Sequence, residues 1–478
     1  MNARTVSVPG LTGAESATVG RLLGVLSDRS VGNARRDRLY EGREAVQLLG
    51  ASIPAQYTRA AHIIGWPAKA VDALARRCVL VEMVDASEGD DLGLRQLARE
   101  NELRSELAGA VTSMLLHGVA FLVSSRGDKS INEPAGLIHV VSAHDGTGDW
   151  NPRSRRLDSF LSVHARNTPT KSPSAFTLYL PEETISASIE DGKWRVIRYK
   201  GTGEVPVEPL RYQQRPDRRP FGRSRITRPV AGLTRAAMRV AIRMEGHGDI
   251  YSVPQLLVLG ATAEDLTKPG GGSAIGNALG ALYGIPDDPQ AAPGTERAQV
   301  TQISSDTPTA HIQQLRQLAQ LFSGETSIPV SSLGISDMAN PSSADSYLAS
   351  REDLITEADG VLDGITGAVE RAVARSLAYR HGETTAPEEW DIMARWRPVA
   401  HLSHASQADA GVKMLGALPW LAETALGPEL VGMSESQQRR AADLLTKAQA
   451  GDLIDRLLDQ PPAPTADTAV EDAAGGAQ

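Results

Sequence analysis

The chain has 478 residues, a length that is too great for one compact core and predicts two to four domains. Hydrophobic residues make up 41% and aromatic residues only 4%, so the composition predicts a globular protein whose core rests on Leu, Val, Ile and Ala. The single cysteine, Cys78, excludes an internal disulfide and a multi-cysteine zinc site, and we expect it to be a small buried residue.

The first 125 residues predict helices separated by short strands. In "WPAKAVDALARRC" (66–78), Pro67 stands at a first helical position, and "VLVEMV" (79–84) predicts a strand. Residues 107–125 carry no charge and approach the length of a membrane span. The His117-Gly118 step divides this run into a helical and a β-rich half, so we predict a helix, a glycine cap and a buried strand. The N-terminus lacks the pattern of a signal peptide.

From about 137 to 212 the sequence predicts a β-rich, twisted sheet. Its segments are "LIHVVS", "FLSVHA", "AFTLYL", "TISASI" and "WRVIRY". Asp191-Gly192 between the last two segments is a strong hairpin signal.

An amphipathic basic helix is predicted from about Arg223 to Ile250. The preceding sequence "DRRPFGRSRITRP" (217–229) holds five arginines and one aspartate in a chain of net charge −9. At 100° per residue the helix separates an apolar face from a stripe of arginines. The apolar face comprises Ile226, Val230, Leu233, Ala237, Val240 and Met244, and the stripe comprises Arg228, Arg235, Arg239 and Arg243.

Three interpretations of these arginines compete: nucleic-acid contact, ion pairs between subunits, and a solvated helix start. Phosphate contacts would give salt-dependent affinity, and without stacking aromatic residues or a base-reading motif they would be non-specific. From the residues alone, ion pairing is favoured.

The second half of the chain predicts a strand at 251–260, a Gly- and Pro-rich loop at 267–304 and a helix at 309–325. After a loop, the longest helix begins at Ser342 or Ser343, with a serine cap and Asp345 in the first turn. A strand follows Gly382, then helices around 406–417 and 434–458. The last residues, 461–478, predict a disordered tail.

Signatures of catalysis are weak. The run "PGGGSAIGNALG" (269–280) lacks the terminal Gly-Lys-Ser/Thr of a phosphate-binding loop, so we interpret it as a flexible loop. His139 and His144-Asp145, like the pair His401 and His404, offer too few ligands for a metal site on their own. We therefore expect no catalytic residue, no metal and no cofactor, and an enzyme is the weaker hypothesis.

Six runs of sequence occur in a characteristic order. They are "RRDRLYEG" (35–42), "WPAKAVDALARR" (66–77), "PFGRSRITRPVAGLTRAAMRVAIRMEGHGDIYSVPQLLVLG" (220–260), "HIQQLRQLAQLFSGETSIPVSSLGI" (311–335), "NPSSADSYLASREDLITEAD" (340–359) and "RWRPVAHLSHASQADAGVKM" (395–414). In this order they resemble the portal protein family of long-tailed bacteriophages, in the form typical of actinobacteriophages, and the resemblance extends over roughly residues 30–455.

The resemblance implies an α+β portal fold that assembles as a ring, usually of twelve subunits. Its parts would be an N-terminal α/β wing (1–222), a first stem helix (223–250), a small α/β clip (251–306), a second stem helix (307–325), a tunnel loop (326–341), a long wing helix with a returning strand (342–399), a helical crown (400–460) and the tail (461–478).

The implied function is a structural ring at one capsid vertex, through which DNA is packaged and ejected. Implied partners are further copies of the chain, passing double-stranded DNA, the terminase large subunit, the head–tail adaptor, and the major capsid protein with its scaffold. The implied location is the virion, after synthesis in the host cytoplasm, with no membrane contact. ATP hydrolysis would belong to the terminase, and a mostly negative channel would keep DNA from adhering. The alternatives are a non-specific DNA-binding scaffold and an oligomeric enzyme.

Three residue sets acquire roles from this resemblance. The arginine stripe would form intersubunit pairs or touch DNA. The wing–stem junction would hold Arg218, Arg219, Arg223 and Arg225. The tunnel loop facing DNA would present Ile328, Pro329, Val330, Ser331, Ser332, Leu333, Asp337, Met338 and Asn340.

Overall fold

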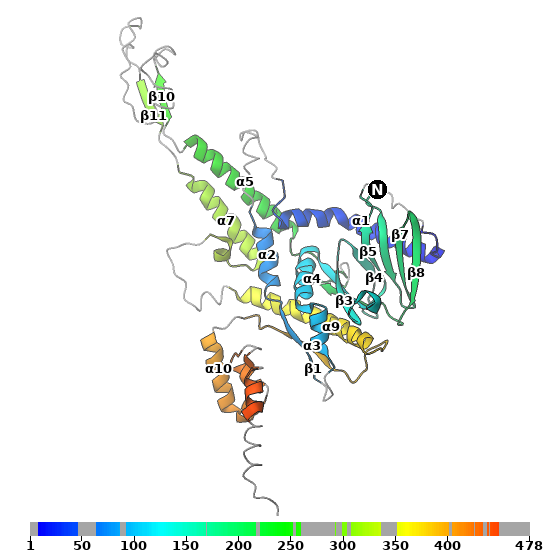
Figure 1. Cartoon of the computed structure of the whole chain (residues 1–478). Coiled ribbons are helices and arrows are strands. Elements are labelled where there is room, and N and C mark those ends of the chain that lie inside the picture. Colours follow the sequence, from blue (N-terminus) through cyan, green and yellow to red (C-terminus); the bar gives the residue numbers. More distant parts are fainter. Residues whose placement is uncertain are drawn as a thin grey trace, which may run out of the picture. The chain divides into compact units, whose positions relative to one another are not determined.

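The computed structural model combines helices and antiparallel sheets, so the chain has the expected mixed α+β fold (Figure 1). It divides into an N-terminal unit, residues 1–399, and a C-terminal unit, residues 400–478. The structure describes residues 8–45, 64–86, 92–168, 170–216, 220–251, 255–259, 292, 299–303, 307–335, 351–400, 404–424, 426–433, 437–438 and 440–448.

A five-stranded meander forms the larger sheet, with each strand antiparallel to the next. Its strands are β4 (Gly146–Asn151), β5 (Arg156–Arg166), β6 (Pro173–Tyr179), β7 (Glu183–Glu190) and β8 (Lys193–Lys200). The predicted hairpin is confirmed: Asp191 and Gly192, with φ of 49° and 75°, make the turn between β7 and β8.

Helix α1 (Gly13–Tyr40) covers this sheet. It begins with a capping box in which Thr12 accepts from the Glu15 amide and the Glu15 carboxylate accepts from the Thr12 amide. Its apolar stripe packs on the inner side chains of the strands, and together they form one core. The core residues from α1 are Val19, Leu22 and Leu26, and those from the sheet include Leu161, Val163, Phe176, Leu178 and Ile185.

The second sheet, in the order β3-β2-β9, lies at the centre of the N-terminal unit. Strand β2 (Val119–Arg126) is flanked by β3 (Gly136–Ser142) and β9 (Val207–Arg211), both antiparallel to it. Alternate residues of β2 enter different cores. Ala120 and Leu122 join the core with α4 (Leu103–His117) and α9 (Glu352–Arg380), whereas Phe121 packs with Phe160 of the larger sheet.

The uncharged run 107–125 is confirmed as a helix, a glycine cap and a buried strand. Gly118 ends α4 with φ of 103°, and its backbone lies so close to Arg223 that an added Cβ would meet backbone atoms at 3.0 Å. None of the described helices is both long enough and apolar enough to cross a membrane.

Shorter elements complete this unit. They are α2 (Trp66–Ala75), β1 (Leu80–Asp85), α3 (Leu94–Glu100), the short 3₁₀ helix η2 (Lys129–Ile131) and β12 (Ile392–Trp396), which pairs antiparallel with β1. Pro67 stands in the first turn of α2 as predicted. Cys78 is confirmed as buried, and burial raises the pKa of its thiol to about 12, so the thiol stays protonated.

The basic helix is α5 (Arg228–Tyr251), and it lies antiparallel to α7 (Thr309–Thr326). Thr227, just before α5, bonds to Glu325 near the end of α7, and the rings of His247 and His311 lie 5.5 Å apart at the opposite ends. The strands β10 (Gln255–Leu259) and β11 (Gln299–Ile303) pair between these helices in the sequence. The predicted start at Arg223 is wrong, because the amides of Arg223 and Arg225 bond to Tyr212 and Leu115 in non-helical backbone, and Pro229 occupies the first turn.

The C-terminal unit is helical in its described part. It contains α10 (His404–Ala417), the 3₁₀ helix η4 (Pro419–Glu423), α11 (Leu426–Leu430) and helical residues 440–448. Helix α10 meets α11 at Gly411, where an added Cβ would lie 2.2 Å from the Leu430 carbonyl oxygen. The predicted tail, 461–478, and the start of the long helix at Ser342 or Ser343 lie outside the described residues.

Candidate functional site

Arg225 is the central residue where the helix pair α5 and α7 meets the rest of the N-terminal unit. Its side chain is only 4% exposed. Nε donates to the Ala70 carbonyl of α2 at 2.7 Å, and Nη2 donates to the Thr326 carbonyl at the end of α7 at 2.7 Å. Nη1 donates to the Tyr212 hydroxyl at 3.0 Å and to the Glu357 carboxylate of α9. One guanidinium thus fixes the start of α5 and the adjacent end of α7 to α2 and α9.

The other predicted junction residues differ from Arg225. Arg223 is exposed and donates from Nε to the Gln213 side chain at 2.5 Å. Arg218 and Arg219 lie outside the described residues. Of the two predicted junction residues that the structure describes, Arg225 is therefore a buried structural arginine and Arg223 is a surface arginine.

The arginine stripe on α5 is not uniform. Arg235 donates from Nε and Nη2 to Glu44 of the same chain at 3.0 and 2.7 Å, so it needs no carboxylate from a neighbouring copy. Arg228, Arg239 and Arg243 form no ion pair with another described residue. An intersubunit or DNA-facing role stays a prediction for these three.

The apolar face of α5 is wider than predicted. Val230, Ala237 and Val240 are buried as expected. Met238 and Ile242, which are outside the predicted face, are buried as well, with exposures of 2% and 1%. The helix is therefore enclosed on more than one side.

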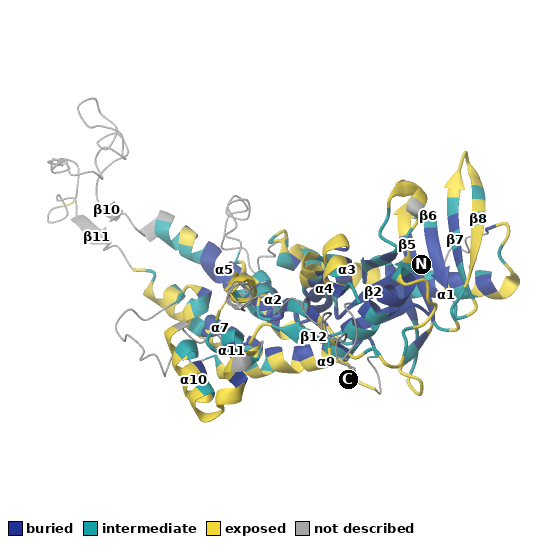
Figure 2. Ribbon diagram, turned by 60° about the horizontal axis from the view of Figure 1, so that its bottom comes forward, coloured by how far each residue is buried: buried dark blue, intermediate teal, exposed yellow. Residues whose placement is uncertain are grey.

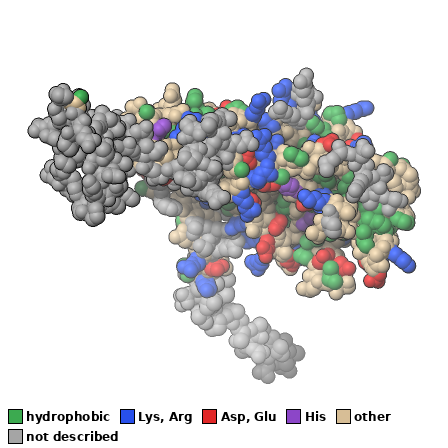
Figure 3. All heavy atoms as spheres, turned by 90° about the horizontal axis from the view of Figure 1, so that it is seen from above, with side chains coloured by type: hydrophobic (Ala, Val, Ile, Leu, Met, Phe, Trp, Pro, Cys, Tyr) green, Lys and Arg blue, Asp and Glu red, His purple; other side chains and the backbone are tan. Residues whose placement is uncertain are grey.

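A basic cleft of about 640 Å³ opens beside the start of α5. Its lining includes Arg29 and Arg36 of α1, Arg223 and Arg228, against one carboxylate, Asp28. Figure 3 shows blue Lys and Arg side chains gathered in a band across the visible face, with purple His side chains beside them. The Arg29 guanidinium lies 5.5 Å from the centre of the Phe221 ring. Burial lowers the pKa of Arg29. This cleft favours anionic groups.

The structure changes the interpretation of the tunnel loop. Residues 330–333 form the 3₁₀ helix η3 (Val330–Leu333), and Ile328 and Leu333 are buried in the same core as α4 and α9. Their side chains anchor the loop in this core, and the predicted contact of the loop with a channel stays a prediction. Of the remaining described members, Ser331 is exposed, Val330 and Ser332 are half-buried, and Pro329 is buried; Asp337, Met338 and Asn340 lie outside the described residues.

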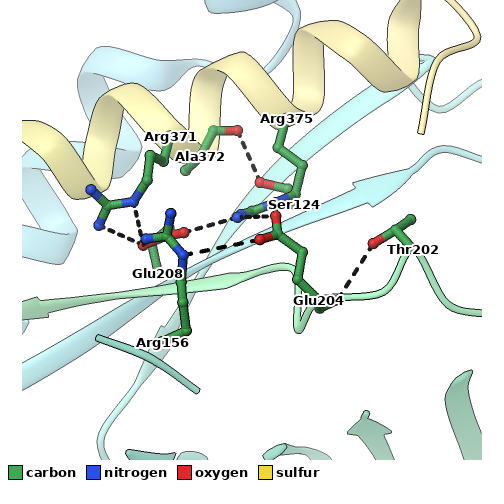
Figure 4. Close-up of polar contacts among 8 residues, drawn as sticks. All are labelled: Ser124, Arg156, Thr202, Glu204, Glu208, Arg371, Ala372 and Arg375. Atoms are coloured by element: carbon green, nitrogen blue, oxygen red, sulfur yellow. Dashed lines mark hydrogen bonds and ion pairs between the residues drawn. The ribbon is translucent and has the colours of Figure 1, made fainter. Parts of the chain in front are cut away.

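A buried ion network, which the sequence did not predict, joins α9 to β9 and to β5 (Figure 4). Glu208 is 1% exposed and accepts from Arg371 at 2.8 Å and from Arg375 at 2.9 Å. Arg375 also donates to Glu204 at 2.8 Å, and Arg156 lies 3.8 Å from Glu208. Burial alone would raise the pKa of Glu208, but the hydrogen bonds and charges of Arg371 and Arg375 lower it, so the group stays ionised.

A weak sequence signal for this network exists. Arg371 and Arg375 stand four residues apart among the apolar positions of the long helix, where charged side chains are uncommon. Glu204 and Glu208 show the same spacing before and within β9. Nothing in the sequence, however, brings the two pairs together, because more than 160 residues separate them.

Known proteins supply the remaining comparison. No protein-family model matches the chain. The portal protein of Mycobacterium phage L5 is 25% identical over 424 residues, which cover 86% of this chain and 85% of that protein. The portal protein of Mycobacterium phage D29 is 25% identical over 427 residues, with the same coverage.

Chains from gene transfer agent necks align more loosely. A chain from the neck of an empty particle has a TM-score of 0.42 and 16% identity, and covers 79% of this chain and 92% of that chain. One from the native particle neck has a TM-score of 0.40 and 14% identity, with coverages of 84% and 99%. The aligned sequence, extending over most of both proteins, makes this chain a homologue of the L5 and D29 portal proteins.

Proposed function

We propose that the chain is the subunit of a ring, of about twelve copies by family resemblance, at one vertex of the phage capsid, and that DNA enters and leaves the head through it. The observation that carries the proposal is the similarity to two mycobacteriophage portal proteins across 86% of the chain. Such a ring is a virion component, and its role is structural.

The stem pair suits a channel wall. Helices α5 and α7 run antiparallel, and the Arg225 side chain ties their wing-proximal ends to α2 and α9. Trp66 of α2 also packs on Phe322 of α7, with ring centres 5.2 Å apart. A subunit built in this way transmits force from the stem to the wing as one body.

The C-terminal unit supports contact between copies. Several of its large apolar side chains are exposed in the single chain, and Figure 2 colours much of the α10 ribbon yellow, the colour of exposed residues. They are Val412, Met414, Leu418, Trp420 and Leu426, exposed by 44–62%. Exposed apolar clusters mark interaction surfaces, and in a portal ring neighbouring crowns would cover these side chains.

The finer assignments extend the same proposal. Residues 1–222 would be the wing, 251–306 the clip that meets the terminase and later the head–tail adaptor, 326–341 the tunnel loop and 400–460 the crown, with the capsid protein and scaffold around the wing. The net charge of −9 supports a channel wall that repels phosphate and lets DNA slide.

Phage particles made without this chain test the proposal. We expect heads that assemble but contain no packaged genome, measured by nuclease-protected DNA per head, with packaging restored by the chain supplied in trans. Normal DNA content in heads that lack the chain would contradict a portal function. Loss of DNA binding alone, without loss of packaging, would instead favour a non-specific DNA-binding scaffold.

A further inference from the structure

Two histidines and one aspartate from three separate elements meet beside the basic cleft. Asp37 stands near the end of α1, His117 is the last residue of α4, and His144 lies between β3 and β4. His117 Nε2 is 3.3 Å from Asp37 Oδ1, and His144 Nε2 is 2.8 Å from Asp37 Oδ2. The two rings meet edge to face with centres 4.6 Å apart.

The donor atoms have the spacing that one metal ion requires. One ligand atom from each of the three side chains lies within 4.8 Å of the other two. Tetrahedral zinc, with bonds of about 2.0–2.1 Å, holds its ligand atoms about 3.3 Å apart. Small side-chain rotations would therefore bring all three groups into a single coordination sphere.

The buried histidine has no other described role. The His117 side chain is 5% exposed, and its Nδ1 has no hydrogen-bond partner, so the ring's polar contact is with Asp37. Nε2 is the nitrogen that faces Asp37, so it is the atom that would bind a metal ion.

The chemistry of the donors selects the metal. Two imidazoles and one carboxylate suit Zn²⁺ and related transition ions, whereas Ca²⁺ and Mg²⁺ prefer oxygen ligands. His117 also lines the cleft, and the His144 side chain is 36% exposed, so an ion and a water ligand have access.

We propose that Asp37, His117 and His144 form a transition-metal site, occupied by Zn²⁺ with water as the fourth ligand. The ion would clamp α1 to the end of α4 and to the β3–β4 turn. The sequence does not predict the site, because Asp37 lies 80 residues before His117, and of the two histidine pairs considered in the sequence only His144 supplies a ligand. The inference does not depend on the portal function.

Calorimetric titration of the EDTA-treated, full-length chain with ZnCl₂ tests the site. We expect one Zn²⁺ per chain, a raised melting temperature on addition of zinc, and visible Co²⁺ bands of four-coordinate intensity when Co²⁺ replaces zinc. His144→Gln, at a half-exposed position that tolerates change, should weaken binding by more than the ~10–100-fold typical of losing an outer-shell partner. Asp37→Asn should do the same.

The matched control is His164→Gln, an exposed histidine that bonds to Thr177 outside the cluster. This variant should bind zinc like the unchanged chain. Equal zinc affinity in His144→Gln and the unchanged chain, or no stoichiometric binding in the unchanged chain, would overturn the proposal. If a variant fails to fold, the zinc stoichiometry and Co²⁺ spectrum of the unchanged chain still decide it.

Discussion

The N-terminal and C-terminal units place similar side chains in opposite environments. In the N-terminal unit Trp66 is 6% exposed and packs on Phe322, and even the charged Glu208 is 1% exposed with its guanidinium partners in place. In the C-terminal unit Trp420 is 62% exposed. The first unit satisfies its apolar and charged groups within one chain, whereas the second presents apolar groups for another surface to cover. Substitutions should accordingly affect folding in the first unit and assembly in the second.

The largest expected effect is on folding, at Glu208. Glu208→Gln would remove the buried carboxylate and leave the Arg375 guanidinium with only the more exposed Glu204 carboxylate, and breaking a buried pair costs about 3–5 kcal/mol. Denaturant unfolding of the isolated chain measures the loss. Glu190→Gln, at an exposed pair with Arg195, is the control and should change little. Equal stability of the two variants would show that the network does not hold α9 to its sheet.

The next effect is on assembly, at Trp420. Trp420→Ser should leave the unfolding free energy of the monomer nearly unchanged, because the indole side chain is largely exposed in the single chain. It should weaken association between copies by about 2 kcal/mol, as expected for an aromatic side chain central to an interface. Sedimentation velocity across a concentration series measures this. Unchanged association, or a large loss of monomer stability, would break the contrast between the two units.

A smaller effect distinguishes two members of the arginine stripe, Arg235 and Arg239. Arg235→Glu sets a like charge against Glu44 and should lower monomer stability by about 1 kcal/mol. Arg239→Glu, without a described ion pair in the chain, should spare stability and impair ring formation. Thermal melting and ring yield distinguish the variants. Normal rings together with a loss of salt-sensitive DNA binding in Arg239→Glu would favour DNA contact over intersubunit pairing.

The smallest effect is a pH dependence at Glu15. The hydrogen bond from Arg198 lowers the pKa of Glu15 from 4.5 to about 2. Because the folded-state pKa is the lower one, this contribution is complete above pH 4.5 and disappears as the pH falls towards 2. Melting curves of Glu15→Gln and the unchanged chain should converge over that interval. A constant difference between them would contradict the assignment.

The sequence predicted local structure well where one short-range pattern decides it. Pro67, Gly118 and the Asp191-Gly192 turn each act within a few residues, and the structure has all three as expected. The start of α5 was misplaced because backbone bonds from Arg223 and Arg225 to distant residues override the helical periodicity there.

The functional residues were harder to predict because their partners are distant in sequence. The pattern placed Arg225 and Arg235 in one basic run, but the fold buries the first among α2, α7 and α9 and pairs the second with Glu44. The resemblance assigned Ile328 and Leu333 to a loop facing DNA, and their side chains are buried in a core that residues far along the chain complete. Charge and spacing identify such residues, and only the fold identifies what they contact.

Native mass spectrometry of the purified full-length chain tests the central claim most directly. A portal subunit should give a closed assembly whose mass is a fixed multiple of 50.9 kDa, about twelve by family resemblance, with a central hole in electron micrographs. A single 50.9-kDa species at every concentration, under conditions in which the chain is folded, would contradict the claim.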